Sequence, residues 1–177
     1  VTGPDDVQHL TEDEIRGIIS VVEGDSSILP FEDEFIGQDL VNEDELKGSK
    51  IKEVVPVELF DAEEWILENG IKVVYRKADY EKESISLYAH SDGGTALYGV
   101  KDLPNAENAA VFTNAYGVGE FNTIALKKAL AGKMVSCSTS IGSDNEVVTA
   151  SSTPQDLETM FQLLYLRFTS PRMDKEK

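Results

Sequence analysis

The residues that decide the fold run from 65 to 132. They open with WILENGIKVVY (65–75), in which two runs of strand-forming residues are joined across Asn69-Gly70. This pair suits the positive φ angles of a tight hairpin turn, so the segment predicts a β-hairpin. A further strand is predicted over 84–92, where apolar and polar residues alternate, and Gly93-Gly94 ends it.

Two helices are predicted next. The run NAAVFTNAY (108–116) is nearly uncharged, which favours a buried helix. Asn122 is a suitable N-cap for the second helix, and Gly132 is a suitable C-terminal stop.

Strands, a turn and a last helix complete the pattern. Alternating residues predict strands over 133–141 and 146–151 with a turn between them. Thr153-Pro154 marks the start of the last helix and Pro171 its end. Its predicted buried face comprises Leu157, Met160, Phe161, Leu164, Tyr165 and Phe168. The order of elements predicts an α+β fold, a mainly antiparallel sheet with its helices packed on one face.

This ordered set of features resembles the pitrilysin and insulinase type of zinc metallopeptidase (inverzincin). The resemblance covers roughly residues 63–172 and includes the Asn69-Gly70 turn, the Gly93-Gly94 strand end and the helix that follows. It implies a metallopeptidase half-domain of the LuxS/mitochondrial-processing-peptidase-like fold.

In the active domain of that family, the corresponding helix carries the zinc motif His-x-x-Glu-His. The resemblance places Ala110, Thr113 and Asn114 at the positions of the two histidines and the glutamate. Ala110 has no donor atom, Thr113 is not a base near neutral pH, and Asn114 is a poor zinc ligand. We therefore predict no catalytic, metal or cofactor-binding residue in this chain, and zinc in the catalytic half of the parent protein.

The other candidate residues fit ordinary structural roles better than metal binding, catalysis or phosphate binding. His9 and His90 are the only histidines, and a zinc site would need both to converge with Cys137 or a carboxylate. Cys137 is expected to be a buried, inert thiol. The glycines in 117–119 predict a turn between two helices, because the P-loop lysine and the preceding strand are both missing.

The N-terminal region differs from the rest in charge. Residues 1–64 hold 19 acidic and 4 basic residues, and residues 65–177 hold 14 and 12, which together give the net charge of -17. The acidic region contains one predicted helix, which starts at the capping box Thr11–Glu14 and stops at Gly24. We expect residues 25–52 to form an extended connector that docks at a few apolar side chains, among them Leu29, Phe31, Phe35 and Ile36.

These patterns predict two parts. Residues 1–62 form an acidic helix and an extended interdomain linker, and residues 63–177 form the N-terminal part of a non-catalytic pitrilysin-like domain. A strand is also predicted over 51–60, at a sheet edge because it contains Pro56.

Composition limits the classes of function. The excess of negative charge disfavours nucleic acid as a partner, and no apolar run approaches the roughly 20 residues needed to span a bilayer. The chain starts without Met or a signal peptide, so we expect it to be a piece of a longer protein.

The resemblance implies a non-catalytic domain of a zinc metalloendopeptidase, which contributes wall to the substrate chamber and positions the peptide. Its partners would be the catalytic half of the parent chain and a peptide or protein substrate, in the periplasm or cell envelope. The alternative is a structural or assembly subunit of the same ancestry without peptidase activity. Because an unfinished sheet exposes an edge, we also expect a homodimer at least as readily as a monomer.

Overall fold

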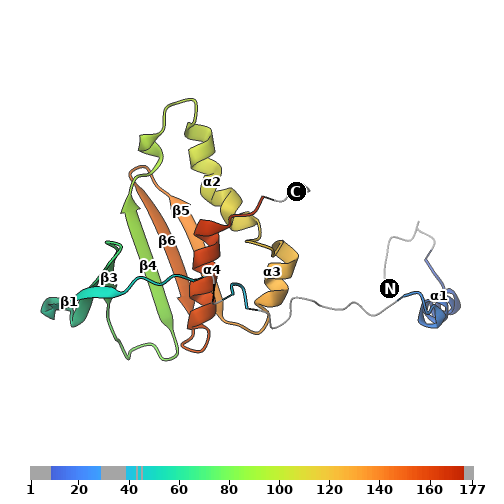
Figure 1. Cartoon of the computed structure of the whole chain (residues 1–177). Coiled ribbons are helices and arrows are strands. Elements are labelled where there is room, and N and C mark those ends of the chain that lie inside the picture. Colours follow the sequence, from blue (N-terminus) through green and yellow to red (C-terminus); the bar gives the residue numbers. More distant parts are fainter. Residues whose placement is uncertain (1–8, 29–38, 43, 45, 174–177) are drawn as a thin grey trace. The chain divides into compact units, whose positions relative to one another are not determined.

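The computed structural model describes residues 9–28, 39–42, 44 and 46–173 (Figure 1). The chain divides into two compact units, Val1–Glu34 and Phe35–Lys177. The sequence-based boundary between residues 62 and 63 stays a prediction. Among the predicted docking side chains of the connector, Leu29, Phe31, Phe35 and Ile36 lie outside the described residues.

The first unit contains helix α1 (Glu12–Gly24), which starts as predicted. The Glu14 backbone N–H donates to Thr11 Oγ1 at 3.3 Å, and the Thr11 backbone N–H donates to Glu14 Oε2 at 2.8 Å. This reciprocal pair is the capping box, and it satisfies two of the N–H groups that a helix start leaves unpaired. The apolar stripe of α1, formed by Ile15, Ile18, Ile19 and Val22, is exposed.

The second unit begins with a three-stranded antiparallel sheet in the order β1-β2-β3. Its strands are β1 (Ile51–Val57), β2 (Ala62–Leu67) and β3 (Lys72–Tyr75), with a short 3-10 turn, η2 (Glu58–Phe60), after β1. Pro56 lies in β1, which is at the edge of this sheet as predicted. An edge strand tolerates proline because one side of its backbone needs no partner.

The hairpin between β2 and β3 forms where the sequence predicted it. Gly70 has φ +87°, and the Asn69 side chain accepts a hydrogen bond from the Ile71 backbone N–H at 3.1 Å. Of the two turn residues, only Gly70 has a positive φ angle, which glycine adopts without strain. The Asn69 side chain stabilises the turn through its hydrogen bond to the backbone. Trp65 and Tyr75 stack across the two strands with ring centroids 5.0 Å apart.

A second antiparallel sheet has the order β4-β6-β5. Its strands are β4 (Ile85–Asp92), β5 (Val135–Ile141) and β6 (Asn145–Ser152), and β6 pairs with both neighbours over its length. The Gly93-Gly94 pair ends β4, with Gly94 at φ +79°, and leads into a short 3-10 turn, η3 (Thr95–Leu97). The predicted strands are therefore present, within two residues of their expected ends.

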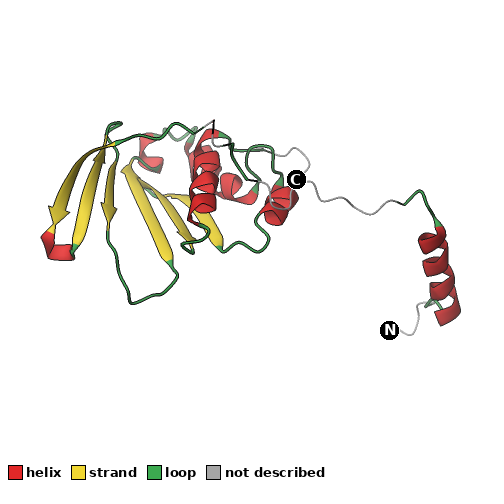
Figure 2. Ribbon diagram, turned by 60° about the horizontal axis from the view of Figure 1, so that its bottom comes forward, coloured by secondary structure: helices red, strands yellow, loops and turns green. Residues whose placement is uncertain are grey.

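Three helices accompany this sheet: α2 (Leu103–Ala115), α3 (Thr123–Ala129) and α4 (Leu157–Thr169). The helix α2 packs on β5, and α4 packs on β5 and β6. Figure 2 shows these helices gathered on one side of the strands. The predicted α+β class with antiparallel strands is confirmed, but the strands form two three-stranded sheets where the sequence predicted one.

The caps of α3 follow the sequence. The Asn122 side chain accepts from the backbone N–H groups of Ile124 and Ala125 at 3.0 and 2.9 Å, and Gly132 has φ +81° just after the helix. The start of α4 differs. Thr153 makes a local turn by accepting from the Asp156 N–H at 3.2 Å, and the helix itself begins one turn later, at Leu157.

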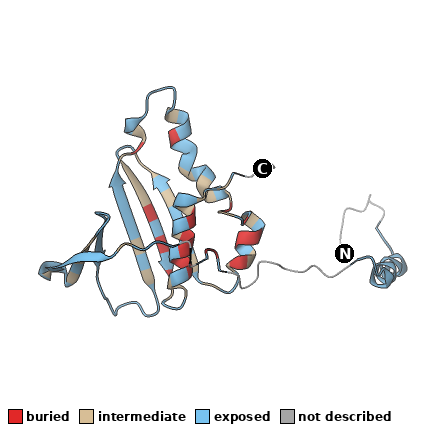
Figure 3. Cartoon of the chain, viewed as in Figure 1, coloured by how far each residue is buried: buried red, intermediate tan, exposed pale blue. Residues whose placement is uncertain are grey.

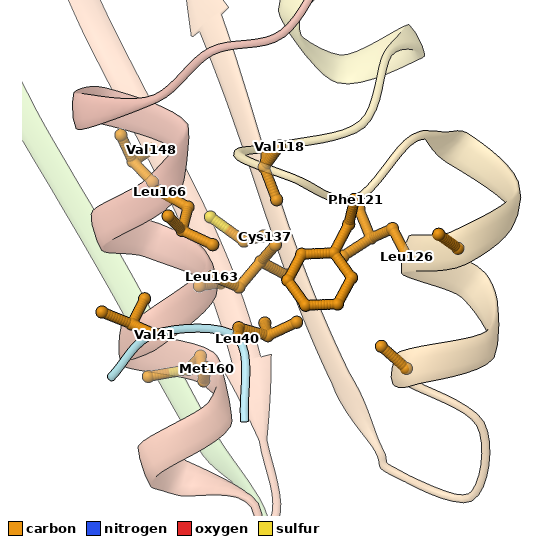
Figure 4. Packing of buried hydrophobic residues seen from close by; sticks show 13 residues of the cluster. Leu40, Val41, Val118, Phe121, Leu126, Cys137, Val148, Met160, Leu163 and Leu166 are labelled. Carbon is orange, nitrogen blue, oxygen red and sulfur yellow. The ribbon is translucent and has the colours of Figure 1, made fainter. Parts of the chain in front are cut away.

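The apolar core lies between the second sheet, α3 and α4 (Figures 3 and 4). Its fully buried side chains are Met160 and Val118. Around them lie Leu40, Val41, Phe121, Ala125, Leu126, Ala129, Cys137, Val148, Ala150, Leu163 and Leu166. The connector therefore docks through Leu40 and Val41, two residues that the sequence reasoning did not name.

The predicted buried face of α4 is wrong for its aromatic residues. Phe161 and Phe168 are 49% and 66% exposed, whereas Thr159 and Gln162 are buried. Both polar side chains have partners: Lys133 Nζ donates to Thr159 Oγ1 at 2.7 Å, and the Leu40 N–H donates to Gln162 Oε1 at 3.0 Å. Because these partners satisfy them, the helix can turn a partly polar face toward the core.

The segment 108–116 is helical, but the expectation that it is buried is wrong. Ala106 is the one buried residue of α2, and Phe112 is 48% exposed. The helix covers β5 with one face only. Phe112 and Tyr116 instead lie against each other on the outer part of α2, with ring centroids 6.4 Å apart. An uncharged composition therefore did not distinguish a half-covered helix from a buried one.

Candidate functional site

The three positions that the resemblance predicts for the zinc motif lie together on the side of α2 that faces β5. Asn114 is hydrogen-bonded to the backbone of Thr139: its Nδ2 donates to the Thr139 carbonyl at 2.7 Å, and its Oδ1 accepts from the Thr139 N–H at 3.1 Å. Since β5 is at the edge of its sheet, Asn114 occupies backbone groups that a neighbouring strand would otherwise pair with. The asparagine thus ties α2 to the edge strand.

Thr113 extends the same network. Its hydroxyl donates to the Ala110 carbonyl at 3.1 Å and lies 3.3 Å from Thr139 Oγ1. The Thr113 carbonyl accepts a hydrogen bond from Nη1 of Arg167, near the end of α4. The side chains of Thr113 and Asn114 thus join α2 to β5, and the main-chain carbonyl of Thr113 joins α2 to α4.

Arg167 is half-buried beside Cys137. Burial lowers the pKa of the guanidinium, and burial raises the pKa of the Cys137 thiol, an effect that the nearby Arg167 charge opposes. Arginine stays protonated at neutral pH, whereas the thiol stays neutral. Arg167 Nε is buried and has no hydrogen-bond partner among the residues that the structure describes. The prediction of a buried Cys137 is confirmed.

A cavity of about 430 Å³ adjoins this network. Ala109, Ala110 and Thr113 line it from α2, and Arg167 and Phe168 line it from α4. The strands contribute the rest of its wall, namely Ala89, His90, Ser91, Thr139, Ser140, Ile141, Glu146, Val147 and Val148. The wall is mainly apolar, with the half-buried cation Arg167 and one carboxylate, Glu146.

The described residues also contain no cluster of metal-ligating side chains. No group of three or more histidine, cysteine, aspartate and glutamate side chains there could hold a metal ion. His90 is exposed on β4 with its ring 6.1 Å from that of Tyr88, while Cys137 is buried on β5. His9 belongs to the other unit.

The turn predicted between two helices is present at Gly117 to Gly119. An added Cβ at Gly117 would lie 1.9 Å from the Phe121 carbonyl oxygen, and Gly119 has φ +52°. Close backbone approach therefore requires glycine at 117, and positive φ favours it at 119. No helix in the described part of the chain is long and apolar enough to cross a membrane.

Sequence reasoning missed Arg167. In the sequence, it is a basic residue in the last turn of a helix, a place where cations are common because of the helix dipole. Only the packing of α2 against β5 and α4 brings it to the motif positions.

No family model matches the chain. Two curated relatives do match. One is a probable zinc protease PqqL of Haemophilus influenzae, 28% identical over 110 residues that make up 62% of this chain and 12% of the relative. The other is a zinc protease PQQL-like of Arabidopsis thaliana, 24% identical over 170 residues, or 94% of this chain and 15% of the relative. The matched part is thus less than a sixth of either relative.

Solved structures share the fold. The periplasmic protease PqqL from Escherichia coli superposes with a TM-score of 0.72 at 19% identity, over 93% of this chain and 18% of that one. The ferredoxin protease FusC, solved in complex with Arabidopsis ferredoxin, superposes with a TM-score of 0.69 at 20% identity, over 98% of this chain and 19% of that one. The relatives and the shared fold support an insulinase-type zinc protease domain, so the resemblance read from the sequence is confirmed.

Proposed function

We propose that this chain, an insulinase-type zinc protease domain, is a non-catalytic domain of a zinc metalloendopeptidase. Its role would be to form part of the wall of the substrate chamber and to position the peptide while the catalytic half of the parent chain supplies zinc. Holding a substrate in the correct orientation and excluding water assist catalysis without any proton transfer by this domain.

The observation that carries the proposal is how the motif positions are used. Zinc hydrolysis needs imidazole or carboxylate donors and a general base. Here Ala110 lacks a donor atom, the Thr113 hydroxyl donates to a carbonyl of its own helix, and both ends of the Asn114 amide bind Thr139. In this proposal Asn114, at one of the expected metal-binding positions, instead attaches a helix to an edge strand.

Substrate class and location extend the proposal. The relatives are named zinc proteases, which favours the peptidase over the assembly subunit considered above. FusC was solved with a protein, ferredoxin, and the Escherichia coli PqqL is described as periplasmic. By analogy we propose a protein or peptide substrate and a periplasmic or cell-envelope location.

Metal analysis of the full chain tests whether the positions matched to the zinc motif bind metal. We expect no stoichiometric zinc after purification with added zinc, and no cleavage of a protein substrate by the chain alone. One tightly held zinc per chain would contradict the proposal.

A triple variant tests the alignment of the motif itself. The changes Ala110→His, Thr113→Glu and Asn114→His should give Co²⁺ or Zn²⁺ binding that the natural chain lacks, because they restore donors on one helical face. The matched control carries the same residue types one position earlier: Ala109→His, Phe112→Glu and Thr113→His. Equal metal binding by the two variants would refute the assigned positions.

A further inference from the structure

We infer that the cavity beside Arg167 is a binding site for a peptide carboxylate. The inference rests on the proposed function, because it names the chemical group of a substrate peptide that this domain would hold. The site would occupy the place next to the motif positions where an active domain has its chemistry, and it would use an arginine in place of a metal.

The first argument is the state of the guanidinium. Arg167 donates a hydrogen bond from Nη1 to the Thr113 carbonyl, while its buried Nε has no hydrogen-bond partner among the described residues. The ion pairs found in that part of the chain are Arg16–Glu12 and Lys72–Glu64, so no carboxylate of the described chain pairs with Arg167. A partly buried guanidinium that no carboxylate of the described chain neutralises favours an anion beside it. A carboxylate suits arginine in particular, since the planar fork presents parallel N–H groups.

The second argument is the shape of the site. The volume of about 430 Å³ is within the range of ligand pockets, roughly 300–1,000 Å³. Ala109, Ala110 and Val148 give it apolar walls that fit an aliphatic stem. Ala109 and Phe168 line the cavity and are also exposed to solvent, so a peptide can enter the cavity from solution.

Glu146 is the one acidic side chain in the wall, and it opposes an anion. Its Oε2 accepts a hydrogen bond from Ser91 Oγ at 3.1 Å, which holds it toward β4. Neutralising this group should therefore strengthen binding of a carboxylate, whereas removing the arginine should weaken it. This opposite pair of effects is not expected of a merely apolar pocket.

The test is an NMR titration of the full chain in 0.15 M salt, where the Debye length of about 8 Å limits repulsion by the acidic region. The probes are three short peptides: acetyl-Ala-Glu-Ala-amide, acetyl-Ala-Gln-Ala-amide and acetyl-Ala-Ala-Ala with a free carboxyl terminus. We expect the Arg167 Nε–H resonance and the α2 amides at 109–113 to shift with a carboxylate peptide. The first and third peptides distinguish a side-chain carboxylate from a terminal one.

Variants decide the assignment. Arg167→Met should weaken carboxylate binding about tenfold or more, and Glu146→Gln should strengthen it. Arg76→Met is the matched control, because Arg76 lies near the Tyr80 ring and does not line the cavity. If Arg167→Met does not fold, Ala109→Leu fills the opening from an exposed position and should abolish binding.

The outcomes separate the two proposals. If neither carboxylate peptide binds more tightly than the glutamine peptide, or if Arg167→Met leaves the affinity unchanged, the carboxylate site is overturned and the positioning role stays intact. Stoichiometric zinc in the chain would instead overturn the proposed function. A resonance shift confined to carboxylate peptides and lost in Arg167→Met supports the site.

Discussion

Replacing Asn114 with alanine should loosen the attachment of α2 to the second sheet. The side chain makes two hydrogen bonds with the Thr139 backbone, at 2.7 and 3.1 Å, and both residues are half-buried. A typical net contribution of 0.5–1.5 kcal/mol per hydrogen bond gives a loss of about 2 kcal/mol in the free energy of unfolding. For a unit of this size, that loss lowers Tm by about 4–8 °C.

The assay is thermal and urea unfolding followed by circular dichroism. Asn108→Ala is the matched control, because Asn108 is exposed and donates only to the Pro104 carbonyl within the same helix. Its effect should stay within about 0.5 kcal/mol, as for most surface substitutions. Equal stability losses in the two variants would refute the assignment of Asn114 as the link between helix and sheet.

The same variant should also change association. With Asn114 gone, the Thr139 N–H and C=O of the edge strand lose their partners, and an unpaired edge favours pairing with another chain. Sedimentation velocity should therefore show more dimer for Asn114→Ala than for the natural chain at equal concentration. A monomer at high concentration in both would count against edge-to-edge dimers, including the homodimer expected from the sequence.

Three further predictions follow from local features. Because burial raises the pKa of Cys137, its thiol should react with iodoacetamide at pH 8 far more slowly in the folded chain than in urea, and equal rates would contradict its burial. Hydrogen bonds from the Met134 backbone and the Thr153 side chain lower the pKa of Asp156 in the folded chain. The stability that Asp156 contributes is therefore present above about pH 4, and it is lost as the pH falls through the pKa of the folded chain. In urea unfolding at a series of pH values, Asp156→Asn should show a smaller loss of stability at acid pH than the natural chain. Gly117→Ala places a Cβ 1.9 Å from the Phe121 carbonyl oxygen and should cost about 3 kcal/mol or more, whereas Gly99→Ala, with nothing within 4 Å, should cost less than about 1 kcal/mol in the same assay.

The elements with local signals were predictable from the sequence. The capping box at Thr11, the Asn122 cap, the hairpin glycine at Gly70 and the alternation on β5 each depend on residues within a few positions of one another. Such signals act through hydrogen bonds and backbone angles that form before distant parts of the chain meet. The order of these elements also sufficed to indicate the peptidase fold.

The tertiary structure alone decided what each helix face contacts. Phe161 and Phe168 are exposed while Gln162 is buried, because Gln162 meets the Leu40 backbone from 122 residues away. Arg167 reaches the motif positions only through packing of α4 beside α2. The sequence by itself determined which elements form, and it predicts that the positions matched to the zinc motif lack metal donors. Contacts between distant residues determined the core and the cavity, since burial and hydrogen-bond partners depend on the whole fold.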